Sequence, residues 1–172
     1  MSDMGFRAMA LTFKIRDFFW PRRDVVKEAG IKQGYRVLDF GCGSGSYVTA
    51  VAELVGKSGK VYALDVQPLA IEMVKKIAAK NELTNVETIL SDRKTGLPED
   101  STDVVLLYDV FHDLTDPDGV LEELHRVLRS DGILSLSDHH MKHDEIVSKV
   151  TNRNFFTLLK KEEKTYNFAK MK

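Results

Sequence analysis

The sequence contains one cysteine, no long apolar run and almost no net charge. Cys42 is the only cysteine among 172 residues, which excludes an intramolecular disulfide and a zinc site built from several cysteines. No run of about 18 or more apolar residues is present, as a membrane-spanning helix would require. Lys and Arg total 25 against 26 Asp and Glu, so no excess of positive charge favours binding to nucleic acid or to an anionic membrane.

The N-terminus also lacks the apolar core and the small-residue cleavage site of a signal peptide. Apolar residues make up 43% and charged residues 30% of the chain, an ordinary balance for a globular protein. A length of 172 residues suits one domain with a substantial core. We therefore expect a single-domain, cytoplasmic protein without a membrane or nucleic-acid partner.

Strand-like and helical segments alternate through most of the chain. The expected strands are Tyr35–Phe40, Lys60–Leu64, Val86–Leu90, Val104–Tyr108 and Gly132–Ser137. The expected helices are Tyr47–Val55, Pro68–Asn81 and Pro117–Leu128. Two of them begin at a proline, which suits a first helical turn, and Asp116 is an expected N-cap. Such alternation predicts an α/β fold with a doubly wound, mostly parallel sheet and helices on both faces.

The last part of the sequence has a different pattern. A helix near Asp144–Arg153 is followed by two strand-like segments, Phe155–Lys160 and Thr165–Met171. The charged residues 161–164 between them form a connection that is too short for a parallel crossover. We therefore predict a C-terminal antiparallel hairpin.

The most informative segment is Val37–Gly45, which reads V-L-D-F-G-C-G-S-G. Glycines at alternate positions allow a sharp turn and a close approach of the backbone to a ligand. Asp39 puts negative charge beside that turn, where a phosphate-binding loop needs positive potential. Asp65 ends the second strand 20 residues beyond Gly45, the spacing of an acid that accepts ribose hydroxyls. The pattern predicts a ligand that contains a nucleoside.

Two nucleoside ligands compete for this site. NAD(P) sites carry G-x-G-x-x-G, whereas this chain has G-x-G-x-G after Asp39, whose carboxylate would lie beside the pyrophosphate. S-adenosylmethionine has no phosphate and carries a sulfonium and an amino group. The acid beside the glycine turn therefore favours S-adenosylmethionine over NAD.

Four segments together resemble the motifs of the class I S-adenosylmethionine-dependent methyltransferases, especially of their small-molecule branch. Val37–Gly45 resembles the D-x-G-x-G-x-G motif, and Tyr62–Asp65 resembles the acidic second motif. Leu97–Val105 resembles the L-P-x-x-D/S-x-x-D-x-V segment that leads into the fourth strand. Leu124–Gly132 resembles the L-x-R-V-L-K-P-G-G turn, with Ser130-Asp131 in place of the usual Pro and Gly.

The resemblance, which covers about Arg36 to Met171, implies a seven-stranded Rossmann-like sheet in the order 3-2-1-4-5-7-6 with an antiparallel seventh strand. It also implies methyl transfer from S-adenosylmethionine, with S-adenosylhomocysteine as the product. The residues that match the family's cofactor site are Asp39, Gly41, Cys42, Gly43, Gly45, Asp65, Val66, Asp92, Arg93 and Tyr108.

Within that set, the resemblance divides the contacts between the two ends of the cofactor. The glycine backbone, the acid before it and Tyr108 would lie near the methionine portion. Asp65 would bind the ribose, and Val66 would pack on the adenine. Asp92 would accept the adenine amino group, with Arg93 adjacent through its backbone.

His112 is the candidate catalytic base. It lies about one helical turn beyond the fourth expected strand, in the segment Y-D-V-F-H-D. Imidazole titrates near neutral pH and could take a proton from a substrate hydroxyl or amine. The alternative is a residue that orients the loop or the cofactor.

A second group of histidines follows the fifth expected strand, in the segment D-H-H-M-K-H-D at residues 138–144. His139 and His143 could share a helix face at a spacing that metal ligands use. No nearby motif completes a ligand set, so no metal is predicted. Contact between one histidine and the substrate is a second interpretation, and an ordinary loop and helix start is a third.

The N-terminal segment Phe6–Trp20 is rich in aromatic residues interleaved with charged ones. We interpret it as a lid that excludes water from methyl transfer; the alternative is an amphipathic helix packed on the sheet. The expected organisation is a helical cover over residues 1–30, a cofactor-binding core over 35–138, and a helix plus hairpin over 139–172.

The predicted function is methyl transfer from S-adenosylmethionine to an O, N, S or C atom of a small-molecule nucleophile. The connection between the fifth and sixth strands has room for one helix and for no substrate-capping insertion, which favours a small substrate. The alternative is a non-catalytic S-adenosylmethionine-binding protein, or the partner subunit of a methyltransferase complex. A homodimer is a further expectation.

Overall fold

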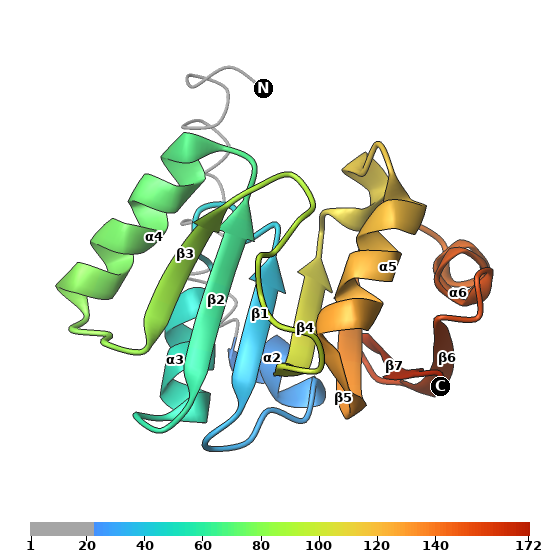
Figure 1. Ribbon diagram of the computed structural model, residues 1–172, viewed down its shortest axis with the longest axis horizontal. Helices are drawn as coiled ribbons and strands as arrows, with labels where there is room; N and C mark the ends of the chain where they lie inside the picture. Colours follow the sequence, from blue (N-terminus) through green and yellow to red (C-terminus); the bar gives the residue numbers. More distant parts are fainter. Residues whose placement is uncertain (1–22) are drawn as a thin grey trace.

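A seven-stranded sheet in the order β3-β2-β1-β4-β5-β7-β6 forms the centre of the protein (Figure 1). The computed structural model describes residues 23–172, so the expected lid at Phe6–Trp20 lies outside the described residues. The strands are β1 Arg36–Phe40, β2 Lys60–Asp65, β3 Val86–Leu90, β4 Thr102–Tyr108, β5 Leu128–Ser137, β6 Phe156–Lys161 and β7 Tyr166–Lys170. The helices are α2 Arg23–Glu28, α3 Val48–Val55, α4 Pro68–Lys80, the 3-10 helix η1 Phe111–Asp113, α5 Pro117–Val127 and α6 His143–Thr151.

The strand order and the strand directions confirm the predicted fold. Strands β1 to β5 pair in parallel, and β7 pairs antiparallel with both β5 and β6. Strand β1 lies between β2 and β4, so the strand order reverses there. In open α/β sheets the ligand site lies at the carboxyl ends of the strands beside such a reversal.

Alternate side chains of the central strands pack on opposite faces of the sheet. Val37 of β1 and Leu106 of β4 pack with α2 and α3 on one face. Leu38 and Leu107 pack with α5 and α6 on the other, and Figure 1 shows α5 in front of the sheet and α3 behind it. Burial on both faces explains why these strands are almost continuously apolar. Asp39 is the acid within β1, and it is 2% exposed.

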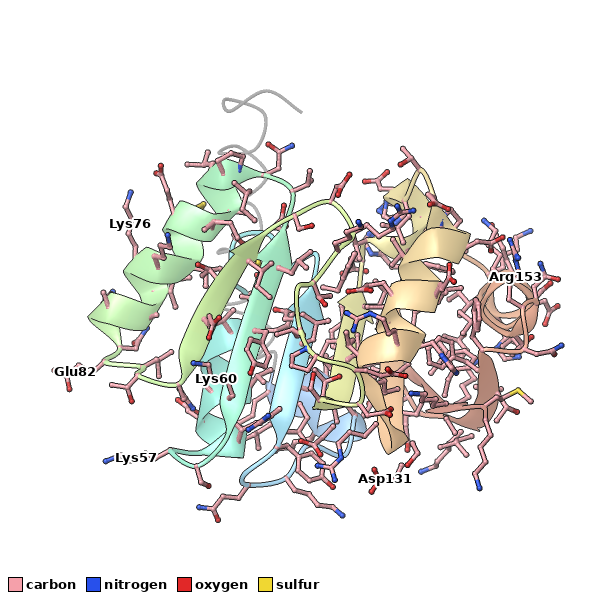
Figure 2. All side chains as sticks on the ribbon, in the orientation of Figure 1. Lys57, Lys60, Lys76, Glu82, Asp131 and Arg153 are labelled. Atoms are coloured by element: carbon pink, nitrogen blue, oxygen red, sulfur yellow. The ribbon has the colours of Figure 1, made fainter. Side chains whose placement is uncertain are left out.

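Strand β5 begins at Leu128, so the predicted start at Gly132 is wrong. Thr102 pairs with Leu128, and the next pair is Val104 with Ile133, so residues 129–132 form an irregularity in the ladder between β4 and β5. The Leu128 side chain is fully buried in the core, which holds this early part of the strand against the sheet. Figure 2 labels the exposed Asp131 at the sheet edge away from the carboxyl ends of β1 and β4.

The N-cap predicted for α5 is confirmed, because the Asp116 carboxylate accepts the Gly119 N–H at 3.0 Å. This cap lies at the end of the segment that connects η1 to α5. The segment lies at the carboxyl end of β4, so the cap fixes one wall of the site described below.

Helix α2 is joined to the β6–β7 turn through Glu28. The Glu28 carboxylate accepts hydrogen bonds from the Lys164 N–H and from the hydroxyl of the buried Thr165, each at 3.0 Å. The Glu28 carbonyl also accepts a hydrogen bond from the Asn167 side chain at 2.6 Å. These contacts hold the hairpin turn against the start of the described chain.

We predict that Glu28→Ala lowers the free energy of unfolding by about 1–3 kcal/mol, because the substitution leaves the Thr165 hydroxyl and the Lys164 N–H without their acceptor. The measurement is the urea midpoint at unchanged m-value. Glu163→Ala, an exposed acid in the same turn, is the matched control and should change stability by less than about 0.5 kcal/mol. Equal effects of the two substitutions would contradict the assignment.

Candidate functional site

The turn after β1 has a backbone that requires glycine. Gly41, Gly43 and Gly45 all have positive φ, at 77°, 52° and 81°. A Cβ at Gly41 would lie 2.7 Å from Cγ2 of Val110, so a larger residue would displace the segment that follows β4. The Gly41 and Cys42 N–H groups donate to the Leu64 carbonyl at 2.8 and 2.9 Å. The turn is thereby fastened to the end of β2.

Asp65 makes the second connection between the turn and β2. One oxygen of its carboxylate accepts the Gly43 N–H at 2.9 Å, and the other accepts the Gln67 N–H at 2.8 Å. Burial raises the pKa of Asp65, although N–H donors from Gln67, Gly43 and Val66 act to lower it. These backbone donors therefore fix the orientation of the Asp65 carboxylate.

A cavity of about 530 Å³ opens over this turn, and we call it the glycine-turn cavity. Its volume is within the range of small-molecule sites. The residues expected at the cofactor that line it are Gly41, Cys42, Gly43, Asp65, Val66, Asp92 and Tyr108. The other lining residues are Ser44, Ser46, Tyr47, Gln67, Asp109, Val110, Asp113, Leu114 and Thr115.

The other three expected cofactor residues do not line this cavity. Asp39 is buried within β1. Gly45 faces α4, where a Cβ would lie 3.0 Å from Cδ1 of Ile77. Arg93 forms a salt bridge with Asp116.

Val66 is an exposed apolar side chain in this cavity. It is 58% exposed, although the neighbouring Asp65 is buried. Asp92 is exposed on the same side. An apolar surface beside an acceptor is a suitable place for a flat, hydrogen-bonding ring.

Asp39 is a buried acid with an unsatisfied oxygen. Its Oδ2 atom has no hydrogen-bond partner among the described residues. Burial, and secondly the nearby charge of Asp65, raise the pKa of Asp39 to about 7. Its charge also acts on the Cys42 thiol and the Tyr108 hydroxyl, and both residues line the cavity. A cation bound there would lower the cost of ionising Asp39.

Neither Tyr108 nor Cys42 is placed to act as an acid, a base or a nucleophile. The Tyr108 hydroxyl forms a 2.9 Å hydrogen bond with the Ser135 hydroxyl, and its ring packs edge-on against Tyr47. Burial raises the pKa of Tyr108 and that of the Cys42 thiol well above their usual ranges. Cys42 packs as a small apolar residue in a cluster with Val48 of α3, Ala63 of β2 and Val74 of α4.

His112 is paired with Asp138 outside the cavity. Its ring Nδ1 atom lies 3.0 and 2.9 Å from the two Asp138 oxygens, and its backbone N–H donates to the same carboxylate at 3.0 Å. The His140 N–H donates to Asp138 at 3.0 Å. Burial acts to raise the pKa of Asp138, but hydrogen bonds from His112 and His140 outweigh it and lower that pKa. His112 does not line the glycine-turn cavity.

A second cavity, of about 510 Å³, lies between the ends of β4 and β5 and the β6–β7 turn, and we call it the hairpin-turn cavity. Tyr47 and Asp109 line both cavities, so the two spaces meet at these residues. His139 lines the hairpin-turn cavity, and its Nδ1 atom lies 2.7 Å from Oδ1 of Asp109.

The histidines after β5 do not form the helix face considered for metal binding. Helix α6 begins at His143, so His139 lies in the preceding loop. His143 stacks on Tyr166 with ring centroids 5.4 Å apart. Within residues 23–172, no group of three or more His, Cys, Asp or Glu side chains is placed to hold a metal ion.

Sequence reasoning missed the residues that reach the site from distant or irregular segments. Leu114 and Thr115 line the glycine-turn cavity. The sequence feature that could have predicted them is an apolar residue, Leu114, within the otherwise polar loop D-L-T-D-P. Lys161 and Lys164 line the hairpin-turn cavity. The local sequence of the β6–β7 turn carries no sign that it folds back towards α2.

The sheet order and the acids in the last two positions of β1 and β2 define the class I S-adenosylmethionine-dependent methyltransferase fold. Residues 31–171 match the family model of a methyltransferase domain. The chain belongs to this methyltransferase family, whose cofactor is S-adenosylmethionine. In the part of the chain that the structure describes, no helix is both long enough and apolar enough to cross a membrane.

Curated relatives match the chain over part of their length. Demethylmenaquinone methyltransferase from Geobacillus stearothermophilus is 32% identical over 113 residues, which cover 65% of this chain and 48% of the relative. Aklanonic acid methyltransferase DauC from Streptomyces sp. (strain C5) is 38% identical over 92 residues, which cover 52% of this chain and 42% of the relative. The matched part of the chain spans about half the length of these two relatives.

A solved structure matches the chain almost from end to end. It is a S-adenosylmethionine-dependent methyltransferase from Aquifex aeolicus, with a TM-score of 0.81 and 28% identity. The match covers 95% of this chain and 98% of that one. The fold therefore occurs in a methyltransferase of similar extent.

We predict that Asp39→Asn changes how stability depends on pH. An acid whose pKa is raised to about 7 by folding binds more protons in the native state than in the unfolded state, so stability falls as pH rises from about 4 to 7. The amide removes this contribution, and the variant should be more stable than the parent by about 1–3 kcal/mol at pH 8. Urea unfolding at pH 5 and pH 8 measures the difference.

The control for this prediction is Asp92→Asn, which neutralises an exposed acid at the same cavity. Its stability should stay within about 0.5 kcal/mol of the parent at both pH values. An Asp39→Asn variant that is no more stable than the parent at pH 8 would show that the buried carboxylate carries no such cost.

Proposed function

We propose that this chain binds S-adenosylmethionine in the glycine-turn cavity and transfers its methyl group to a small-molecule nucleophile. The observation that carries the proposal is the unpartnered oxygen of Asp39, next to residues that line the cavity. A phosphate ligand would increase the cost of that buried charge, whereas a ligand with a sulfonium and an amino group would decrease it. The site therefore suits a cationic nucleoside.

The described residues fit the two ends of this cofactor. The backbone of the turn, from Gly41 to Gly45, would hold the methionine portion, with Asp39 acting through its charge. Asp65 retains lone pairs beyond its two backbone bonds and would accept the ribose hydroxyls. Val66 would pack on the adenine, which accounts for an apolar side chain that is 58% exposed.

Asp92 would accept the adenine amino group from its exposed position in the same cavity. Arg93 would contribute through its backbone, because its side chain is engaged with Asp116. Tyr108 would contribute the face of its ring, because its hydroxyl is bonded to Ser135. These roles remain predictions until a ligand is bound.

When bound, S-adenosylmethionine supplies a methyl carbon activated by a positively charged sulfur. The chain's contribution is to hold the acceptor in line with that carbon and to keep water away. The hairpin-turn cavity meets the glycine-turn cavity at Tyr47 and Asp109. We propose that this junction is where donor and acceptor meet.

The names of two curated relatives give demethylmenaquinone and aklanonic acid as acceptors. We take from these names the proposal that the acceptor is a small molecule, with the acceptor atom left open among O, N, S and C. A cytoplasmic location, the absence of a nucleic-acid partner, a single domain and a homodimer remain predictions from the sequence.

We predict that S-adenosylhomocysteine binds the unmodified protein and that NAD does not, as measured by isothermal titration calorimetry. Asp65→Ala should weaken the binding by at least about 100-fold, because it removes a charge-assisted acceptor and the anchor of Gly43. Asp131→Asn, at the opposite edge of the sheet, should bind like the parent (Figure 2). Tight binding of NAD alone would overturn the ligand assignment.

A second variant separates loss of binding from loss of folding. Val66→Asp alters an exposed side chain, so it should fold like the parent, and it should weaken binding by about 10-fold or more by removing the apolar surface under the adenine. Unchanged affinity of Val66→Asp would exclude adenine from that position.

The transfer itself is tested with radiolabelled S-adenosylmethionine and a panel of hydroquinone, 1,4-dihydroxynaphthalene, catechol and simple amines and thiols. Label in an acceptor product supports the proposed activity. Binding of S-adenosylhomocysteine without transfer to any of them would favour the alternative, a non-catalytic binding protein or the partner subunit of a methyltransferase complex.

A further inference from the structure

Asp109 and His139 form a pair at the junction of the two cavities. Asp109 lines both the glycine-turn cavity and the hairpin-turn cavity, and His139 lines the second. The Nδ1 atom of His139 lies 2.7 Å from Oδ1 of Asp109, and the His139 N–H donates to the same oxygen at 3.4 Å. The pair comes from two different strand ends, β4 and β5.

From this geometry we propose that His139, oriented by Asp109, is the base that takes the proton of the methyl acceptor in the hairpin-turn cavity. This proposal rests on the methyl transfer proposed above and assigns its proton-transfer step. Under this proposal the base is the residue that follows Asp138, and His112 helps to position the loop that carries it.

The contact with Asp109 determines which nitrogen of His139 is available. A carboxylate beside Nδ1 favours the neutral imidazole with its proton on Nδ1, which leaves the lone pair on Nε2. The same carboxylate stabilises the imidazolium that forms when Nε2 takes a proton. His139 has a side-chain exposure of 62%, so Nε2 is accessible to an acceptor in the cavity.

The backbone of Asp109 is built to present its carboxylate in this direction. Its φ is 54°, a left-handed conformation that Asp and Asn adopt more readily than other side chains. Its N–H donates to the Ser137 carbonyl at 2.7 Å, which joins the ends of β4 and β5. The turn after β4 therefore brings the carboxylate to the loop that carries His139.

His112, the base expected from the sequence, is less well placed for that role than His139. It lines neither cavity, and a carboxylate lies beside each of its ring nitrogens: Asp138 beside Nδ1, and Oδ2 of Asp113 at 3.5 Å from Nε2. The Asp138 carboxylate also accepts the His140 N–H at 3.0 Å. His112 and Asp138 therefore hold the backbone on either side of His139, as positioning residues.

Other charged groups lie around this pair. The loop after β5 contributes His140, whose ring centroid lies 3.9 Å from that of His139, and Asp138. The β6–β7 turn contributes Lys161, Glu162, Glu163 and Lys164 to the cavity lining. The charges of these two lysines and two glutamates balance, and Asp109, whose Oδ1 atom lies 2.7 Å from Nδ1, is the dominant partner of His139.

In the proposed step, the Nε2 lone pair takes a proton from an O–H, N–H or acidic C–H group of the acceptor. The electron pair left on that atom forms the new bond to the methyl carbon. The carbon–sulfur bond breaks with its electrons on sulfur, so the sulfonium becomes a neutral thioether and the positive charge ends on the imidazole. The acceptor class that needs such a base carries a proton on its nucleophilic atom.

The first test requires no turnover. Long-range 1H–15N NMR of the histidine side chains of the full chain at pH 8, without ligand, should show His139 with its proton on Nδ1. Asp109→Asn keeps a residue that tolerates the left-handed backbone and should reduce the population of that tautomer. A His139 ring protonated on Nε2 in the parent protein would overturn the proposal.

The second test uses whichever compound of the acceptor panel is methylated. His139→Gln should lower kcat by about 10²–10⁴-fold while the affinity for S-adenosylhomocysteine stays unchanged, and the remaining rate should increase with added imidazole or at higher pH. His112→Gln should lower kcat by less than about 10-fold. The matched control is His125→Gln, since His125 contacts the Met171 carbonyl and lines neither cavity.

The outcomes of this second test distinguish the two proposals. If the unmodified protein does not bind S-adenosylhomocysteine, the result counts against the proposed function. Full activity of His139→Gln in a protein that methylates the panel compound, or a larger loss in His112→Gln than in His139→Gln, would overturn the assignment of His139 alone.

Discussion

The Asp65 carboxylate is the contact on which the site depends. It accepts N–H groups from Gly43 in the turn after β1 and from Gln67 after β2, so one side chain fixes the separation of two strand ends. The Gly41 and Cys42 N–H groups reinforce the same connection through the Leu64 carbonyl. Because a turn with three glycines of positive φ loses much conformational entropy on folding, it needs such anchors to present a fixed surface. The glycine-turn cavity is therefore shaped by backbone hydrogen bonds rather than by packing of large side chains.

This arrangement brings two acids, Asp39 and Asp65, close together, and their negative charges repel each other. Burial raises the pKa of both Asp39 and Asp65, and the charge of Asp65 raises that of Asp39 further. Both charges also raise the pKa of the Cys42 thiol. Asp65 is compensated by backbone donors, whereas Oδ2 of Asp39 has no partner within residues 23–172. A buried acceptor left in this way costs stability in the unliganded protein. In the proposed function, binding of a cationic ligand would recover this cost.

Most of the fold, and most of the residues that line the glycine-turn cavity, could be predicted because their signals are local. The alternation of strands and helices and the acids at positions 39 and 65 lie in continuous segments, and parallel strands bring their carboxyl ends to one edge. Contacts between distant segments were harder to predict. The start of β5 at Leu128 depends on pairing with Thr102. The pairing of His112 with Asp138, whose two oxygens both face its Nδ1 atom, likewise joins segments that are distant in the sequence.

The proposed acceptor side of the site is built from parts that can vary without disturbing the proposed cofactor side. The hairpin-turn cavity takes its lining from the ends of β4 and β5, from α2 and from the β6–β7 turn, and that turn is held by Glu28 outside the sheet ladder. Changes in the length or charge of the turn would alter this cavity while the anchors of the glycine turn remain in place. Among residues 23–172, only Tyr47 and Asp109 line both cavities. A residue at such a junction is constrained from two sides, which explains why an acid with a left-handed backbone is tolerated at the end of β4.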